Sequence, residues 1–338
     1  GNISTIQNSN NQSIVASLNF EKFYRNFKFL NKKNSFLDIL KSLKRIRFNY
    51  SENAGKVIPG YIPSIGFFGT SKPSFDFIFG NQKNIRYELA KRGYLTNFSE
   101  FNEQFQQVFN SKFEISAEIQ LLKDLKIDLN ANRNYSKNYS ENYRVEDFNY
   151  EALNPNFYGN FSISSNMLKT SFDKKSMDQS DSFNRMKENL KIISLRLINQ
   201  KGVSNIEYDD QGFPIGFSKN SQEVLIPSFI SAYTGKKAED VSLNPISDKP
   251  KINWSIQYDG LSEAFKDIFS RISFRHSYRS NFTINNFQSN LNYNENSFDS
   301  NGNYESKIFF SNINLVEQFN PLVRIDLELK NSLRLSFD

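Results

Sequence analysis

The last residues of the chain, 323–338, alternate between apolar and polar side chains. The apolar parity holds Val323, Ile325, Leu327, Leu329, Leu333, Leu335 and Phe337. The polar parity begins with Arg324, Asp326, Glu328 and Lys330. A period of two residues is typical of a β-strand with two unlike faces. Because strands in globular proteins usually run about 3–10 residues, the pattern predicts one strand of unusual length.

A second alternating segment lies between residues 109 and 143. Its apolar parity includes Phe109, Phe113, Ile115 and Ile119, and its polar parity includes Lys112, Glu114 and Glu118. The alternation breaks at residues 122–124 and resumes at Leu125, which predicts a long hairpin with a tight turn. Shorter strands are expected at residues 13–20, 45–51, 74–79, 158–172, 252–258, 271–284, 287–293 and 306–319.

Helical spacing of apolar residues occurs in five short stretches between the strands. We expect helices at residues 36–43, 85–92, 182–199, 222–233 and 262–269. Ser35 and Ser262 are candidate N-caps, and Gly93 and Gly235 can end a helix in the left-handed conformation. We expect helical insertions at about 181–200 and 220–242, but no separate soluble domain within residues 1–338.

Composition excludes several classes of protein. The chain has no Cys and a single His, His276, which rules out thiolate and paired-histidine metal sites. No apolar run approaches the roughly 18 residues of a transmembrane helix. The 42 Lys and Arg residues are balanced by 36 Asp and Glu residues, so the surface is mixed and nucleic-acid binding is not expected.

Several local patterns resemble functional sites but lack the residues that such sites need. Residues 299–303 resemble the start of a calcium loop but lack its glycine and its final glutamate. No nucleotide-binding glycine pattern occurs, and His276 is expected to be a packing residue. We therefore expect no enzyme activity, no cofactor and no metal. Arg271, Arg275 and Arg279 share one parity and predict either a solvated row or an electropositive wall.

Long alternating strands need an apolar phase on one side and water on the other. The hydrophobic fraction is only 38%, below the about 45–50% of soluble domains, while 34 Phe and 16 Tyr are too many for a disordered chain. A wide outer-membrane barrel reconciles these values, because its lumen needs no apolar core. A soluble β-sandwich or elongated β protein is the alternative.

The barrel hypothesis assigns each parity to a surface. The candidate lipid-facing residues are Phe109, Phe113, Ile115, Ile119, Ile325, Leu327 and Leu329. The candidate lumen-facing residues are Lys112, Glu114, Glu118, Arg324, Asp326, Glu328 and Lys330.

Several motifs resemble one family. They are IRFNYSENAG at 46–55, IPGYIP at 58–63, DLKIDLNANRNYSKNYS at 124–140 and NSQEVLIPSFISAYTG at 220–235. In this order they resemble the SprA family, the giant outer-membrane translocons of the type 9 secretion system in Bacteroidota. The resemblance implies that the chain is an internal or C-terminal fragment of a very large transmembrane β-barrel, with long antiparallel strands and a few short amphipathic helices.

The resemblance also implies a function and partners. It implies an outer-membrane channel that passes folded cargo proteins with C-terminal sorting domains to the cell surface and supports gliding motility. A plug protein, a shuttle protein and the lipid bilayer would be its partners, without nucleic acid. Two alternatives stay open: a nutrient receptor of the TonB-dependent type, and a soluble β-rich surface adhesin.

Overall fold

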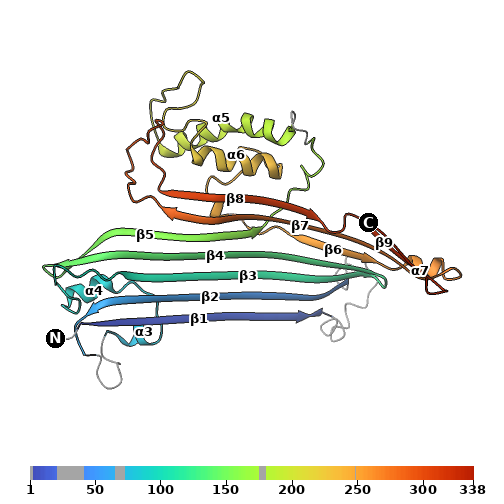
Figure 1. Cartoon of the computed structure of the whole chain (residues 1–338), viewed down its shortest axis with the longest axis horizontal. Coiled ribbons are helices and arrows are strands. Elements are labelled where there is room, and N and C mark those ends of the chain that lie inside the picture. The colour runs from blue at the N-terminus through green and yellow to red at the C-terminus, as the bar shows by residue number, and fades with distance from the viewer. Residues whose placement is uncertain (1–2, 21–41, 65–72, 175–179, 248) are drawn as a thin grey trace, which may run out of the picture.

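The chain folds around one large antiparallel sheet of long strands. The computed structural model describes residues 3–64 except 21–41, and residues 73–338 except 175–179 and 248. The strands are β1 (Ser4–Asn19), β2 (Leu43–Tyr61), β3 (Phe105–Leu122), β4 (Leu125–Glu146), β5 (Asn149–Ser164), β6 (Asn253–Tyr258), β7 (Phe269–Ser289), β8 (Ile308–Phe319), β9 (Arg324–Leu329) and β10 (Arg334–Phe337). The prediction of a mostly β chain with long antiparallel strands is confirmed (Figure 1).

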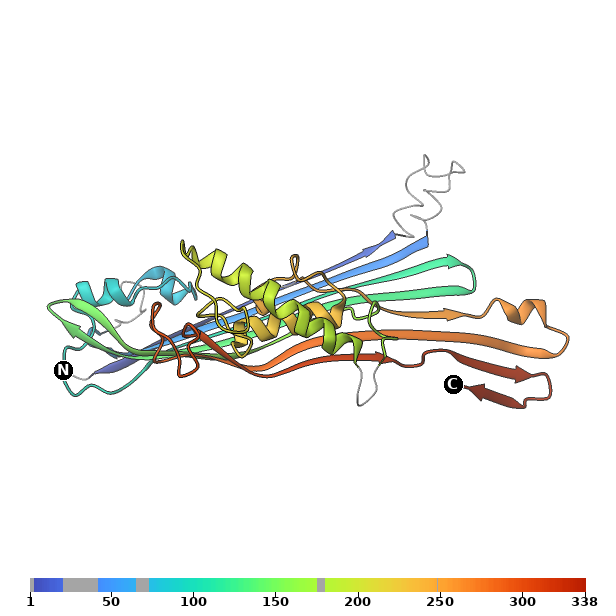
Figure 2. The ribbon, with the colours of Figure 1, turned by 90° about the horizontal axis from the view of Figure 1, so that it is seen from above.

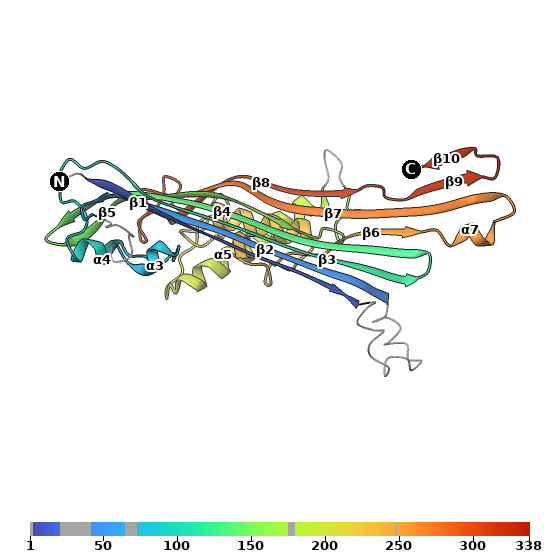
Figure 3. The same ribbon diagram turned by 90° about the horizontal axis from the view of Figure 1, so that it is seen from below.

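The described helices are short relative to the sheet. They are α3 (Phe75–Ile78), α4 (Arg86–Lys91), α5 (Asp181–Lys201), α6 (Gln222–Thr234) and α7 (Leu261–Ala264). Figures 2 and 3 show that α3 to α6 lie over the part of the sheet toward the β4–β5 turn and over its middle. Beyond them the strands continue toward the β3–β4 turn and α7.

Two strands, one after the other, occupy a single position in the strand order of the sheet. We call such a position a lane. β5 and β6 both lie between β4 and β7, and both run antiparallel to these neighbours. The chain leaves the lane after Ser164 and returns before Asn253, where the Lys251 amide donates to the Ser164 carbonyl over 2.9 Å. We call residues 165–252 the helical insertion, because α5 and α6 lie within it. β8 and β9 share the lane on the other side of β7 in the same way.

The helices pack on the sheet through apolar contacts in two places. Ile193 of α5 and Val224 of α6 are fully buried against Phe161 and Ile284 of β5 and β7. At the sheet end, Leu89 of α4 belongs to a second buried cluster with Ile58 and Tyr143. The register of the sheet places Phe161 and Tyr143 on the same face, because Phe161 is opposite Tyr135, which has the same parity on β4 as Tyr143. Both groups of helices therefore cover one face.

The prediction of a single strand at 323–338 is wrong, because this segment is a hairpin. β9 and β10 pair antiparallel, with Leu335 opposite Leu327 and Phe337 opposite Ile325. The turn between them contains Ser332, whose φ is 66°. This register pairs residues of equal parity, so the apolar set stays on one face through the turn. A straight strand and this hairpin therefore give the same sequence pattern.

Other strand predictions have mixed outcomes. The hairpin of β3 and β4 is confirmed, with its turn at residues 123–124. The expected strand 74–79 is wrong: Ser74 caps helix α3, its Oγ accepting from the Phe77 amide over 3.2 Å. Residues 271–284 and 287–289 form one strand, β7, while β5 ends at Ser164 rather than continuing to residue 172.

Three helix predictions are confirmed, at α4, α5 and α6. Gly235 ends α6 in the left-handed conformation, as expected, with φ 65°. The expected helix at 36–43 lies outside the described residues up to position 41, and Leu43 begins β2. The helix at 262–269 is reduced to α7, because the Ser262 hydroxyl bonds the Ile272 backbone and Phe269 already belongs to β7.

Candidate membrane-facing belt and polar face

An apolar band crosses the whole sheet on the face that carries the helices. One row of cross-strand neighbours runs from β1 to β8 through Leu18, Ile46, Ala117, Leu129, Trp254, Tyr278 and Phe319. Another row crosses from β4 to β10 through Leu125, Tyr258, Phe274, Ile325 and Phe337. We call this surface the apolar belt. It comprises Ile14, Leu18, Ile46, Phe48, Tyr50, Phe113, Ile115, Ala117, Ile119, Leu125, Ile127, Leu129, Ala131, Trp254, Ile256, Tyr258, Ile272, Phe274, Tyr278, Phe319, Ile325, Leu327, Leu329, Leu335 and Phe337.

The belt lies beyond the helices that cover the rest of this face. Leu18 is 59% exposed, Ile14 57% and Phe337 55%. Among the described helices, α7 contacts this region at the Ile272 end of β7, while Met167 and Phe172 of the insertion contact Tyr278 and Phe319. An apolar surface of this extent is unfavourable in water, because soluble monomers rarely expose large contiguous apolar patches. Patches of this kind mark surfaces that pack against another protein or a membrane.

The opposite face is polar at the same level. A row crosses the sheet through Glu118, Asp128, Ser255 and Ser277. The next row runs through Lys126, Gln257, Arg275 and Arg324. Charges of both signs pair across this surface, for example Lys126 with Asp128 at 3.3 Å and Arg275 with Asp326 at 3.6 Å. Such exposed pairs stabilise little, about 0–1 kcal/mol each, but they keep the face hydrated without a strong field of one sign.

Farther along the polar face, the charges give way to amides and hydroxyls. A row of five strands presents Asn11, Asn53, Asn110, Ser136 and Asn160 side by side. These residues line a shallow trough of about 470 Å³, and Lys112 is the charged side chain that the polar face contributes to it. The trough is therefore hydrophilic but nearly uncharged along its length.

The candidate lipid-facing and lumen-facing residues lie on opposite faces of the sheet, apart from Lys330. Phe113, Ile115, Ile119, Ile325, Leu327 and Leu329 lie in the apolar belt. Phe109 is on the same face beyond the belt, with its ring centroid 6.1 Å from that of Tyr135. Lys112, Glu114, Glu118, Arg324, Asp326 and Glu328 lie on the polar face. Lys330 lies in the turn after β9, outside the strands. Which phase each face contacts stays a prediction.

His276, Arg271 and Arg275 contact neighbouring groups of the sheet. The His276 ring bonds the Leu322 carbonyl through Nδ1 at 2.6 Å and lies 6.0 Å from the Phe319 ring. Arg271 and Arg275 lie within 3.9 Å and 3.6 Å of Asp259 and Asp326. These contacts are those of a packed and paired surface.

Sequence reasoning missed a buried ion pair at the end of β4. The Arg86 guanidinium of α4 pairs with Glu141, whose side chain is 1% exposed. The Tyr150 hydroxyl donates to the same carboxylate over 2.6 Å, and the Arg86 guanidinium lies 4.1 Å from the centre of the Phe105 ring. One feature of the sequence could have indicated this pair. Glu141 has the same parity as Tyr139 and Tyr143, so a charged side chain lies on the face that carries these aromatic residues.

A side-chain amide closes part of an open strand edge. β8 pairs with β7 on one side. On its other side, the Gln222 amide donates to the Ile308 carbonyl, and the Phe310 amide donates to Gln222 Oε1 over 3.2 Å. The adjacent Glu223 is enclosed by the insertion, and burial raises the pKa of its carboxyl above the ordinary value. Gln222 thus occupies hydrogen-bonding groups that an added strand would need.

Searches for membrane helices and metal clusters gave no candidates among the described residues. None of the described helices combines the length and the apolarity that crossing a membrane requires. The described residues hold no group of three or more His, Asp or Glu side chains arranged to bind a metal ion.

Comparisons with known proteins add no relative. No known family model matches the chain, and no curated protein sequence matches it. The family resemblance therefore rests on the motifs alone.

Proposed function

We propose that this chain forms part of the wall of a large outer-membrane β-barrel that conducts folded proteins to the cell surface. In this proposal the apolar belt contacts lipid and the polar face lines a hydrated lumen. The observation that carries it is the continuous apolar belt, which crosses every lane of one sheet opposite a polar face.

The dimensions of the belt support a membrane wall. On β3 it runs from Phe113 to Ile119, and on β4 from Leu125 to about Ala131. Strands that span an outer membrane need about 9–11 residues when tilted, and the β3–β4 turn adds Leu121 and Leu122 to this height. Beyond the belt, the same face is covered by helices, as expected for the part of a strand that projects out of the bilayer.

Protein conduction, rather than uptake of a small nutrient, is supported by the motifs that resemble the SprA translocons. Residues 124–140 form most of β4, and residues 220–235 form α6 with the Gln222 edge contact. The nearly uncharged trough on the polar face suits a surface past which many different folded proteins must slide. By the same resemblance, the partners are cargo with C-terminal sorting domains and accessory plug and shuttle proteins in the outer membrane.

We expect that depletion of the full-length protein leaves several unrelated surface proteins in the periplasm in their folded state. The reason is that a conduit without substrate-specific pockets serves many cargoes at once. The measurement is cell fractionation followed by protease accessibility of each cargo, with a strain re-expressing the intact protein as the control. Normal surface delivery combined with failed uptake of one nutrient would contradict the proposal and favour a receptor.

A further inference from the structure

A pocket with four lysines opens where the helical insertion leaves and rejoins the sheet. Its volume is about 360 Å³, and its cationic side chains are Lys169, Lys236, Lys249 and Lys251. Ser164, Ser165, Asn166 and Thr234 add hydroxyl and amide groups. None of the described lining residues is acidic, while Asp248, next to Lys249 in the sequence, lies outside the described residues.

The fold fixes the backbone at Lys251 and the start of the Lys169 side chain. The Lys251 amide donates to the Ser164 carbonyl over 2.9 Å, and the Ser164 hydroxyl donates to the Lys251 carbonyl over 2.7 Å. Gly235 packs so closely on Lys169 that an added Cβ would stand 2.8 Å from the Lys169 Cβ. Lys236, which interacts with another group of the chain, follows directly. Within the described residues, Lys169, Lys249 and Lys251 form no ion pair.

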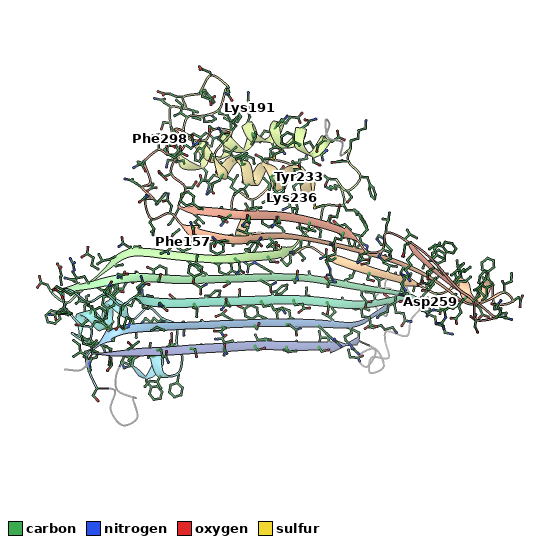
Figure 4. All side chains as sticks on the ribbon, in the orientation of Figure 1. Phe157, Lys191, Tyr233, Lys236, Asp259 and Phe298 are labelled. Atoms are coloured by element: carbon green, nitrogen blue, oxygen red, sulfur yellow. The ribbon has the colours of Figure 1, made fainter. Side chains whose placement is uncertain are left out.

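The pocket lies at the border of the apolar belt. Ile163 and Phe282 line it, and they are cross-strand neighbours on β5 and β7. Ile163 is also opposite Arg133, which is opposite Phe113 at the edge of the belt. Toward the β3–β4 turn the same lanes continue into Trp254 and Tyr278. Figure 4 shows Lys236 between α6 and β8, near the sheet, and Lys191 on α5.

We propose that this pocket binds the phosphate group of a lipid headgroup at the border of the belt. The proposal rests on the proposed function, because it takes the belt to be in contact with lipid. Phosphates lie where the hydrocarbon layer ends, and lysines near an anionic membrane surface are attracted to it. Hydroxyl and amide donors beside the ammonium groups match the several acceptor oxygens of a phosphate.

The test compares two triple variants of the full-length protein reconstituted with vesicles. One variant is Lys169→Gln, Lys249→Gln and Lys251→Gln, and the matched control is Lys187→Gln, Lys191→Gln and Lys219→Gln, which removes the same charge elsewhere on and near the helices. Binding is measured with phosphatidylcholine vesicles and with vesicles that also contain phosphatidic acid. A dispersed short-chain phosphatidic acid, below its micelle concentration, probes the pocket without any bilayer, and inorganic phosphate is the competitor.

We expect the pocket variant to bind phosphatidic acid at least ~10-fold more weakly in both formats, and the control variant to bind as the original chain does. Equal losses in both variants, or no loss in the pocket variant, would overturn the proposal. Full competition by inorganic phosphate at equal concentration would assign the pocket to soluble phosphate and overturn the lipid source. If the protein does not associate with bilayers but the pocket still binds the dispersed lipid, the proposed function is wrong while the phosphate-binding pocket is supported.

Discussion

Ile115→Lys is expected to destabilise the membrane-inserted state of the chain by about 2–4 kcal/mol, the cost of a cation on the lipid face of a barrel. Ile115 lies within the apolar belt between Phe48 and Ala131, its cross-strand neighbours. Lysine at this position has no carboxylate in the same row to pair with. Denaturant titration of the full-length protein folded in vesicles measures the difference.

The matched control for this variant is Glu114→Lys, one residue earlier. Glu114 lies on the polar face opposite Asn49 and Asn132, and its closest ion pair, with Lys112, spans 3.9 Å. The same new side chain in water should change stability by less than ~0.5 kcal/mol. Equal losses for the two variants would show that the faces do not differ in environment.

Arg86→Met is expected to destabilise the folded chain by about 3–5 kcal/mol, because it leaves the buried Glu141 carboxylate without its cation. The Tyr150 hydroxyl would still donate to this carboxylate, but neutral donors do not replace a paired charge in a buried site. Denaturant unfolding of the chain, followed by hydrogen exchange of the α4 amides, would show the loss and where it acts.

Two further variants separate the buried charge from the loss of side-chain packing. Adding Glu141→Gln to Arg86→Met should recover a substantial part of the stability, because position 141 then no longer buries an unpaired carboxylate. Arg92→Met removes the arginine of a pair with Glu88 whose side chains are about half exposed, and it should cost less than ~1 kcal/mol. A double variant no more stable than Arg86→Met would mean that packing of the Arg86 side chain, not charge, dominates.

The sequence pattern was sufficient to assign faces but not connections. Period two fixes which side chains share a surface, so Ile115 and Leu327 could be placed on one face from opposite ends of the chain. It could not distinguish one strand from the β9–β10 hairpin, because their register conserves parity. It also gave no sign that β5 and β6 are one lane interrupted by an insertion, which is a property of long-range pairing.

Local chemistry explains the remaining differences. Residues 74–79 contain three phenylalanines in an alternating pattern, yet the Ser74 cap and Gly80, with φ 77°, close a short helix. The Arg86–Glu141 pair joins residues of distant elements, and the Gln222 contact with β8 depends on where α6 docks. No spacing rule connects such positions, so only the folded structure could bring them together.

Labelling of adjacent single cysteines tests the two-faced wall most directly, because the chain has no Cys of its own. Cysteines are introduced one at a time at Ile115 and Glu114, and at Leu327 and Glu328, in the full-length protein in its membrane. The account predicts that residues 115 and 327 react with a lipid-phase reagent and are protected from a water-soluble one, while residues 114 and 328 behave in the opposite way. Identical labelling of the two neighbours in each pair would contradict it.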